Sequence, residues 1–272
     1  MKLFAFDLDG TSLRKHAYLS ERNKQALYAL HERNVILVPA TGRISSFIPE
    51  CITGLPGIRY MITSNGASVY DREKKKAIYQ DLIPVETALE VQELLGKLDV
   101  YVEFYHEGIV KLERKYQNYD WESEGLPQER RTLFKKDYEI IESYADDLRA
   151  GKMKPEKINL PYIHPKRYKT VYEALLSIDG IYMTSSIQGN IEINSATCNK
   201  GNALAFLARH LGIATEDIMS IGDNGNDLEM LAFAGISVAM GNATEQVKKV
   251  AQYETDICEE DGLAKAVEKF LK

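Results

Sequence analysis

The sequence predicts an α/β protein: a doubly wound, Rossmann-like core with a parallel sheet, and an inserted α+β domain. Two observations lead to this prediction. Toward both ends of the chain, short apolar runs stop at polar clusters and are followed by helical patterns, which is typical of alternating strands and helices. Residues 83–191 lack this alternation and are rich in tyrosine. We therefore expect a core of residues 1–82 and 192–272, with residues 83–191 inserted as a second domain.

The N-terminal part predicts the first elements of the core. An apolar strand at residues 3–6 leads to the helical pattern of residues 20–34, where Ser20 can cap the first turn. The runs "VILVPATGR" (35–43) and "YMITSNGA" (60–67) repeat the plan of a strand that breaks into small polar residues. Their continuous apolar character predicts strands covered on both faces, as in a parallel sheet.

The C-terminal part repeats this organisation and the middle does not. Residues 217–227 and 236–243 each predict a strand and loop that enter a helix, and residues 261–272 predict the last helix. In the middle, the alternation in "YVEFY" (101–105) and "IEIN" (191–194) predicts antiparallel strands with one face in water.

Composition and charge narrow the class of protein. The chain has 272 residues, of which 44% are hydrophobic and 27% charged, as in globular proteins. A net charge of -6 disfavours a general nucleic-acid binder, and the basic runs at 72–76 and 130–136 are typical of solvated surface. Three cysteines without a CxxC predict neither a disulfide framework nor a zinc site. Without an apolar run of about 20 residues or a secretory signal, we expect a cytoplasmic protein with neither nucleic-acid nor membrane partners.

Four polar clusters follow the predicted strands: "DLDGTS" (7–12), "ATGR" (40–43), "CNKGNA" (198–203) and "GDNGND" (222–227). Ligands of doubly wound sheets bind beyond the carboxyl ends of the strands, so the clusters are expected to converge. Two aspartates beside a glycine are also typical of a self-capped turn. Several carboxylates at one sheet edge repel one another unless a cation or protons intervene. Oxygen ligands without His or Cys favour Mg²⁺ over zinc.

The remaining cluster residues suit phosphate chemistry. A magnesium ion held by two carboxylates shields an incoming nucleophile from the negative charge of a phosphate ester. Thr41 offers a hydroxyl, and Gly42 lets the backbone approach a phosphate oxygen closely. Lys200 and Asn226 offer a positive charge and an amide donor for the transferring phosphoryl group. Thr41 or Lys200 alone is typical of ordinary surface, so the set carries the prediction.

In this order, and with the insertion between the second and third, the clusters resemble those of the haloacid dehalogenase-like phosphatases, specifically the Cof-type branch. The resemblance covers both ends of the chain. It implies that Asp7 is the nucleophile and a magnesium ligand. Asp9 is then the general acid/base and lends its backbone carbonyl to the metal, and Asp223 is the third metal ligand.

The resemblance also implies a phosphate-binding set and a supporting residue. Asp227 is expected to orient Lys200. "TSNGA" (63–67) matches a further Cof-type segment, but Asn65 is equally typical of a tight turn and is left outside the catalytic set. Ser12 stands where the family often has an apolar residue, and residues 118–134 match no signature of the family. The implied phosphate ligands are the backbone of Leu8, Thr41, Gly42, Lys200 and Asn226.

The implied activity is Mg²⁺-dependent hydrolysis of small phosphate monoesters through an aspartyl-phosphate, the substrates being sugar phosphates, nucleotides or phosphorylated cofactors. Asp9 is expected to start protonated in its acidic setting and to protonate the leaving alcohol. The insertion is expected to act as a cap that excludes water and reads the substrate. No histidine is assigned a catalytic role.

Two other functions stay open. A phosphomutase on sugar phosphates would use nearly the same residues, and a phospho-accepting receiver-type signalling module also has an acidic pocket at a strand end. The role of Arg43 is open as well, because an arginine at this helix start can contact either the substrate or a nearby carboxylate.

Overall fold

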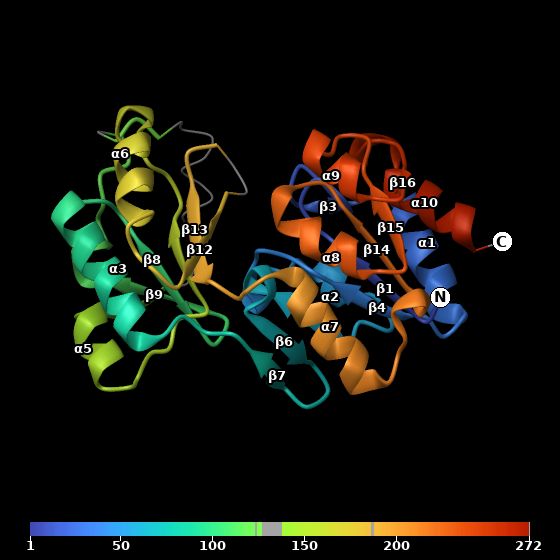
Figure 1. The fold of residues 1–272 in the computed structure, drawn as a ribbon, viewed down its shortest axis with the longest axis horizontal. Coiled ribbons are helices and arrows are strands. Elements are labelled where there is room, and N and C mark those ends of the chain that lie inside the picture. Colours follow the sequence, from blue (N-terminus) through green and yellow to red (C-terminus); the bar gives the residue numbers. More distant parts are fainter. Residues whose placement is uncertain (123, 127–137, 186–187, 272) are drawn as a thin grey trace. The chain divides into compact units, whose positions relative to one another are not determined.

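The chain forms two compact units in the computed structural model (Figure 1). The first, which we call the core, combines Met1–Gln80 with Cys198–Lys272, and the second, the cap, is Asp81–Thr197. No helix in the described part of the chain is long and apolar enough to cross a bilayer. The basic run at 130–136 and part of the tract 118–134 lie outside the described residues. The structure describes residues 1–122, 124–126, 138–185 and 188–271.

A five-stranded parallel sheet runs through the core, in the order β16-β15-β14-β1-β4. The predicted α/β class with a parallel core sheet is therefore confirmed. All residues of β1 are buried, which explains its continuous apolar run. The strands of this parallel sheet are β1 (Leu3–Phe6), β4 (Ile36–Pro39), β14 (Ile218–Gly222), β15 (Ile236–Ala239) and β16 (Tyr253–Glu254).

Helices cover both faces of this sheet (Figure 1). On one face, α1 and α10 pack together over Phe4 and Phe6, and on the other, α7 and α8 pack over Leu3 and Ala5. The predicted cap of α1 is confirmed, because the Ser20 side chain accepts a hydrogen bond from a backbone N–H of the first turn. The helices are α1 (Glu21–Glu32), α2 (Glu50–Thr53), α7 (Lys200–Leu211), α8 (Leu228–Phe233), α9 (Glu245–Val250) and α10 (Gly262–Phe270).

The predicted third strand differs from expectation. β5 pairs antiparallel with β6 and meets the parallel sheet through an isolated bridge between Ala40 and Ile62. The reason is local: the chain reverses in the 3₁₀ turn η2, where Asn65 has a φ of 60°, so the next strand returns along β5. The small antiparallel sheets consist of β2 (Leu13–Arg14) with β3 (Tyr18–Leu19), and of β5 (Tyr60–Thr63), β6 (Ser68–Asp71) and β7 (Lys76–Gln80).

Short 3₁₀ turns connect several elements of the core. Two of them, η2 and η6, come after strands. The second carries Asn226 and Asp227 of the predicted site, and the first carries Asn65. The turns are η1 (Ser45–Phe47), η2 (Ser64–Gly66), η5 (Thr215–Asp217), η6 (Gly225–Asp227) and η7 (Cys258–Glu260).

The cap is built on a six-stranded sheet in the order β10-β9-β8-β11-β13-β12. Its pairs are antiparallel except β9 with β10, so the predicted inserted α+β domain is confirmed. Its strands are β8 (Glu103–His106), β9 (Ile109–Glu113), β10 (Tyr138–Ile141), β11 (Lys157–Leu160), β12 (Ile181–Thr184) and β13 (Ile191–Ser195). Its helices are α3 (Val85–Leu98), α5 (Tyr144–Arg149), α6 (Pro165–Leu175) and the 3₁₀ turn η3 (Arg114–Tyr116).

The predicted domain boundary after residue 191 cuts through β13. That strand pairs with β11 and β12, and the core resumes at Cys198. Strand pairing decides the boundary, because a strand removed from its sheet leaves its backbone groups unpaired.

The prediction that β8 and β13 each have one face in water is also wrong. Glu103 is fully buried and Glu192 is 6% exposed. Lys157 pairs with Glu192 at 3.2 Å. Buried charges and amides need partners, and neighbouring strands supply them here in place of water. The Glu103 carboxylate accepts hydrogen bonds of between 2.8 and 3.3 Å from Tyr101, Tyr105, Tyr138 and Asn159.

Candidate active site

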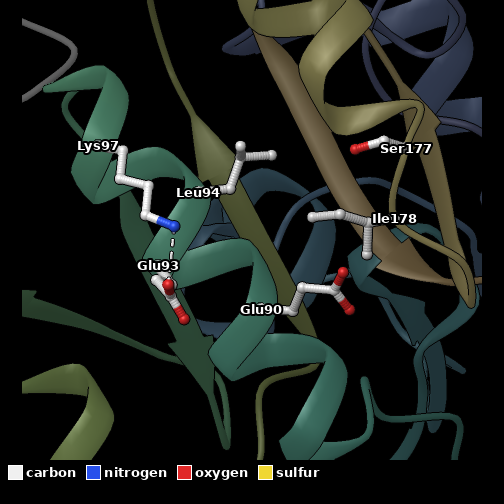
Figure 2. A pocket seen from close by; sticks show the side chains of 6 residues that line it. All are labelled: Glu90, Glu93, Leu94, Lys97, Ser177 and Ile178. Carbon is white, nitrogen blue, oxygen red and sulfur yellow. Dashed lines mark hydrogen bonds and ion pairs between the residues drawn. The ribbon is translucent and has the colours of Figure 1, made fainter.

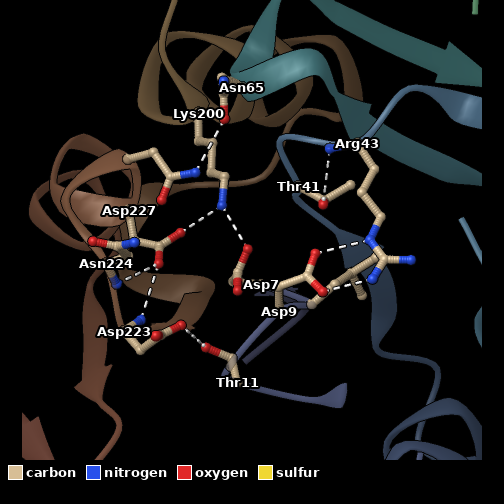
Figure 3. Close-up of polar contacts among 12 residues, drawn as sticks. Asp7, Asp9, Thr11, Thr41, Arg43, Asn65, Lys200, Asp223, Asn224 and Asp227 are labelled. Carbon is tan, nitrogen blue, oxygen red and sulfur yellow. Dashed lines mark hydrogen bonds and ion pairs between the residues drawn. The ribbon is translucent and has the colours of Figure 1, made fainter. Parts of the chain in front are cut away.

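The polar clusters meet because their strands are neighbours. β1 pairs in parallel with β14 and with β4, so Asp7, Asp223 and Thr41 leave three adjacent strands at one edge of the sheet. Lys200 begins α7 and is fully buried. Its Nζ lies 2.7 Å from Asp7 Oδ1 and 2.7 Å from Asp227 Oδ1 (Figure 3). Segments far apart in the sequence thus share one site: Asp7 and Lys200 are separated by 193 positions.

The site carries more negative than positive charge. One carboxylate oxygen from each of Asp7, Asp223 and Asp227 lies within 4.8 Å of the others, and Lys200 is the cation that pairs with two of them. Burial raises the pKa of Asp7 well above its usual value, although Lys200 opposes the shift. Burial and the charge of Asp227 raise the pKa of Asp223 to about 7. Such a set of hard oxygen donors with excess negative charge fits a divalent cation.

Asp227 has both carboxylate oxygens committed within the protein. Oδ1 accepts from Lys200, while Oδ2 accepts from the backbone N–H groups of Asp223 at 2.9 Å and Asn224 at 3.1 Å. Gly222 makes room for it, because a Cβ there would lie 2.4 Å from Asp227 Cγ. These contacts suit a residue that orients Lys200 better than a metal ligand, and they leave Asp7 and Asp223 to face a cation.

Asp9 has a different set of neighbours. Arg43 donates to both of its oxygens, from Nε at 2.8 Å and Nη2 at 2.6 Å, and His16 Nδ1 lies 2.9 Å from Oδ1 (Figure 3). Of the two roles open to Arg43, the structure therefore shows the carboxylate pair. Burial favours the neutral form of Asp9, but the hydrogen bonds from His16 and Arg43 outweigh it and lower its pKa to about 2.

The expectation that Asp9 starts protonated is thus wrong. That expectation assumed that nearby carboxylates dominate its surroundings, whereas its hydrogen-bond partners are a guanidinium and an imidazole. Hydrogen bonds from His16 to Asp9 raise the pKa of His16 in turn. The sequence assigns no role to His16, and nothing in its spacing marks it, because it approaches Asp9 through the hairpin of β2 and β3.

The expected phosphate ligands lie in the turns beside these carboxylates. Thr41 is fully buried, and its Oγ1 accepts from the backbone N–H of Arg43 at 3.1 Å. The carbonyl of Leu8 accepts from the N–H groups of the next turn, so the chain after Asp7 curls tightly. Ser12, the departure from the family pattern, donates to the Asp7 carbonyl at 2.8 Å and stabilises that curl.

Two side chains that the sequence prediction left out of the site are hydrogen-bonded to residues of it. Thr11 Oγ1 donates to Asp223 Oδ1 at 2.7 Å. Asn65, left outside the catalytic set, accepts a hydrogen bond from Asn226 Nδ2 at 3.0 Å. Thr11 lies in the "DGT" motif and could have been included from that match alone. The Asn65 contact depends on two loops that only the fold brings together.

A depression in the cap does not belong to this site (Figure 2). It has a volume of about 300 Å³ and lies beside α3. Lys97 and Glu93 form a 2.8 Å ion pair at its edge, with each side chain 70% exposed. Ion pairs this exposed contribute little to the stability of the fold. The depression contains none of the predicted site residues; its lining consists of Glu90, Glu93, Leu94, Lys97, Ser177 and Ile178.

Comparison with known proteins agrees with this geometry. The family of haloacid dehalogenase-like hydrolases matches residues 4–267. The 5-amino-6-(5-phospho-D-ribitylamino)uracil phosphatase YcsE of Bacillus subtilis is 29% identical over 280 residues, with 100% of this chain and 96% of that protein covered. The HMP-PP phosphatase of Klebsiella pneumoniae is 31% identical over 253 residues, with 91% and 86% covered.

Solved structures show the same fold. That of the subclass IIB sugar phosphatase BT4131 matches with a TM-score of 0.80 at 25% identity, over 99% of both chains. The sequence match along nearly the whole chain and the shared fold with its inserted cap lead to one conclusion: this chain belongs to the haloacid dehalogenase-like hydrolases and is a phosphatase of their Cof-type branch.

Proposed function

We propose that this phosphatase hydrolyses monoesters of small phosphorylated metabolites with Mg²⁺, using Asp7 as the nucleophile. The observation that carries the proposal is the placement of Lys200 between Asp7 and Asp227 in a cluster that otherwise holds an excess of carboxylates. A lysine beside a buried carboxylate can neutralise phosphate oxygens while that carboxylate attacks. The expected phosphate ligands, Leu8, Thr41, Gly42, Lys200 and Asn226, remain part of the proposal.

In the first step, an Asp7 carboxylate oxygen attacks phosphorus in line, and the bond from phosphorus to the ester oxygen breaks. The electron pair stays on the leaving oxygen, which takes a proton from Asp9. In the second step, Asp9 accepts a proton from water as the water oxygen attacks the aspartyl-phosphate. Inorganic phosphate leaves and Asp7 is restored. A bound Mg²⁺, held by Asp7, Asp223 and the Asp9 carbonyl, would supply positive charge that lowers the repulsion between Asp7 and the phosphate.

The ion pair between Arg43 and Asp9 makes the protonation of Asp9 depend on the substrate. At rest, its pKa of about 2 makes Asp9 a carboxylate, which suits the base of the second step. A phosphate ester brings further negative charge beside Asp9, and this repulsion favours the uptake by Asp9 of a proton from solvent, which the first step then passes to the leaving oxygen. Arg43 also offers the departing oxygen a neighbouring positive charge.

The Asp9→Asn variant tests this division of roles. We expect hydrolysis of an alkyl phosphate to fall by about 10² to 10⁴-fold, the usual contribution of a general acid/base. With p-nitrophenyl phosphate, whose leaving group needs no proton, formation of the adduct continues while its hydrolysis slows. Rapid quenching of ³²P-labelled protein then detects covalent phosphate. Equal losses for both esters, without any trapped label, would contradict the acid role.

The activity itself is tested by a screen of phosphate esters with and without Mg²⁺. The panel contains sugar phosphates, nucleotides, phosphorylated cofactors and 5-amino-6-(5-phospho-D-ribitylamino)uracil, the substrate class named for the Bacillus subtilis relative. We expect release of inorganic phosphate, and we expect EDTA to reduce kcat/KM by at least about 10³-fold because the acidic site then lacks its counter-charge. Excess Mg²⁺ should restore activity, whereas Ca²⁺ should restore little, since it favours more ligands at longer distances.

The same screen separates the other functions. Isomerised sugar phosphate without free phosphate would identify a mutase. A phosphoaspartate that lasts for minutes in the unmodified protein would identify a signalling module. Activity that is unchanged after exhaustive chelation would contradict the proposed role of Mg²⁺.

A further inference from the structure

The η2 turn, Ser64–Gly66, is hydrogen-bonded to the loop that carries Thr41. The Ser64 N–H donates to the Arg43 carbonyl at 2.9 Å, and the Asn65 N–H donates to the Thr41 carbonyl at 3.0 Å. Asn65 is 1% exposed, and its φ of 60° and ψ of 22° place it in the left-handed region. Asparagine adopts this left-handed conformation at a lower cost in conformational energy than most other residues with a side chain.

The same turn packs directly against the loop that carries Lys200. Gly66 has a φ of +102°, and a Cβ there would lie 2.2 Å from the Asn199 carbonyl oxygen and 2.8 Å from the Lys200 backbone nitrogen. The absence of a side chain therefore lets the turn contact the start of α7. The turn is thus held from two sides, by the Thr41 loop and by the chain at the start of α7.

The Asn65 side chain reaches the remaining loop. Its Oδ1 accepts from Asn226 Nδ2 at 3.0 Å. Figure 3 shows Asn65 above Lys200. An amide nitrogen has two N–H groups, and Asn65 occupies one. The bond also fixes which way the Asn226 amide faces, because an acceptor at Asn65 selects the nitrogen and not the oxygen of Asn226.

We propose that Asn65 is a positioning residue that acts through Asn226: it orients the amide so that the second N–H donates to the phosphoryl group. This inference rests on the proposed phosphate contact of Asn226. A donor that is already oriented costs no reorganisation when charge develops on the phosphate oxygens. A free Asn226 amide would instead sample the flipped orientation, in which its oxygen faces the phosphate and repels it.

The variant Asn65→Gly isolates the side chain, since glycine keeps the left-handed backbone. In the Mg²⁺-loaded full-length enzyme we expect kcat/KM for p-nitrophenyl phosphate to fall about tenfold, because misplaced groups cost up to about 10²-fold. The Kd for inorganic phosphate, measured by calorimetry, should rise by a similar factor. Asn34→Gly is the matched control: Asn34 also has a φ of 60° but is exposed at the end of α1. It should leave both values within about twofold.

A double-mutant cycle decides between a positioning and a structural role. If Asn65 acts through Asn226, then adding Asn65→Gly to Asn226→Ala changes kcat/KM and the phosphate Kd by less than about twofold. If Asn65→Gly has the same effect with and without the Asn226 side chain, or no effect in either background, the inference is wrong. A wild-type enzyme that binds phosphate but cleaves no ester would overturn the proposed function instead, and the phosphate Kd would still test Asn65. Thermal unfolding of each variant shows that it is folded.

Discussion

Asp7→Asn is expected to lower kcat by at least about 10⁴-fold and to leave the protein folded. The loss is large because a neutral amide oxygen is a poor nucleophile, and no covalent intermediate can then form at this position. The fold should persist because Asn has the shape of Asp and its oxygen can still accept from Lys200 Nζ, which lies 2.7 Å from Oδ1. Burial raises the pKa of Asp7, so its charged form is costly and the neutral amide removes that cost.

A second buried aspartate in the core offers a matched control. Asp71 is fully buried and pairs with Arg59 at 3.0 Å, away from the clusters of the site. Asp71→Asn should therefore retain kcat and lower the unfolding temperature, because hydrogen bonds from Arg59 favour its charged form. Steady-state kinetics and thermal denaturation of both variants check the contrast. Asp7→Asn with more than a tenth of the wild-type kcat would exclude Asp7 as the nucleophile.

Lys200→Met should reduce both activity and stability. Activity falls because the phosphoryl oxygens lose a positive charge, a loss that typically costs about 10²- to 10³-fold in kcat. Stability falls because Asp7 and Asp227 keep their buried carboxylates without the partner that lies 2.7 Å from each. Removing one member of a buried ion pair typically lowers the free energy of unfolding by about 3–5 kcal/mol.

The double variant Lys200→Met with Asp227→Asn separates the two effects. It removes the lysine and one of the two carboxylates that face it, so most of the lost stability should return, while the activity should not. Urea denaturation measures the free energy of unfolding, and the variants are comparable when this free energy falls with urea concentration at the same slope in each. A Lys200→Met protein as stable and as active as the wild type would show that the buried ion pair contributes to neither property.

Much of the fold follows from local chemistry that the sequence displays. The cap of α1 at Ser20 and the buried run of β1 depend on neighbours within a few residues, so pattern alone predicts them. The convergence of Asp7 with Asp223 follows almost as directly, because adjacent parallel strands end at one edge of a sheet. The antiparallel pairing of β5 was not predicted, since an apolar run does not say which strand it pairs with.

What the sequence determined by itself is therefore the class of the fold, the identity of the acidic residues and the edge of the sheet at which they gather. Tertiary structure alone decided the protonation state of Asp9 and the hydrogen-bond partners of the site residues. Asp9 is a carboxylate at rest because Arg43, 34 residues away, reaches it, and Asn65 meets Asn226 across 161 residues. Neither contact has a sequence pattern, because side chains on loops are oriented by the packing of the elements beneath them, and a hydrogen bond forms only when that packing is complete.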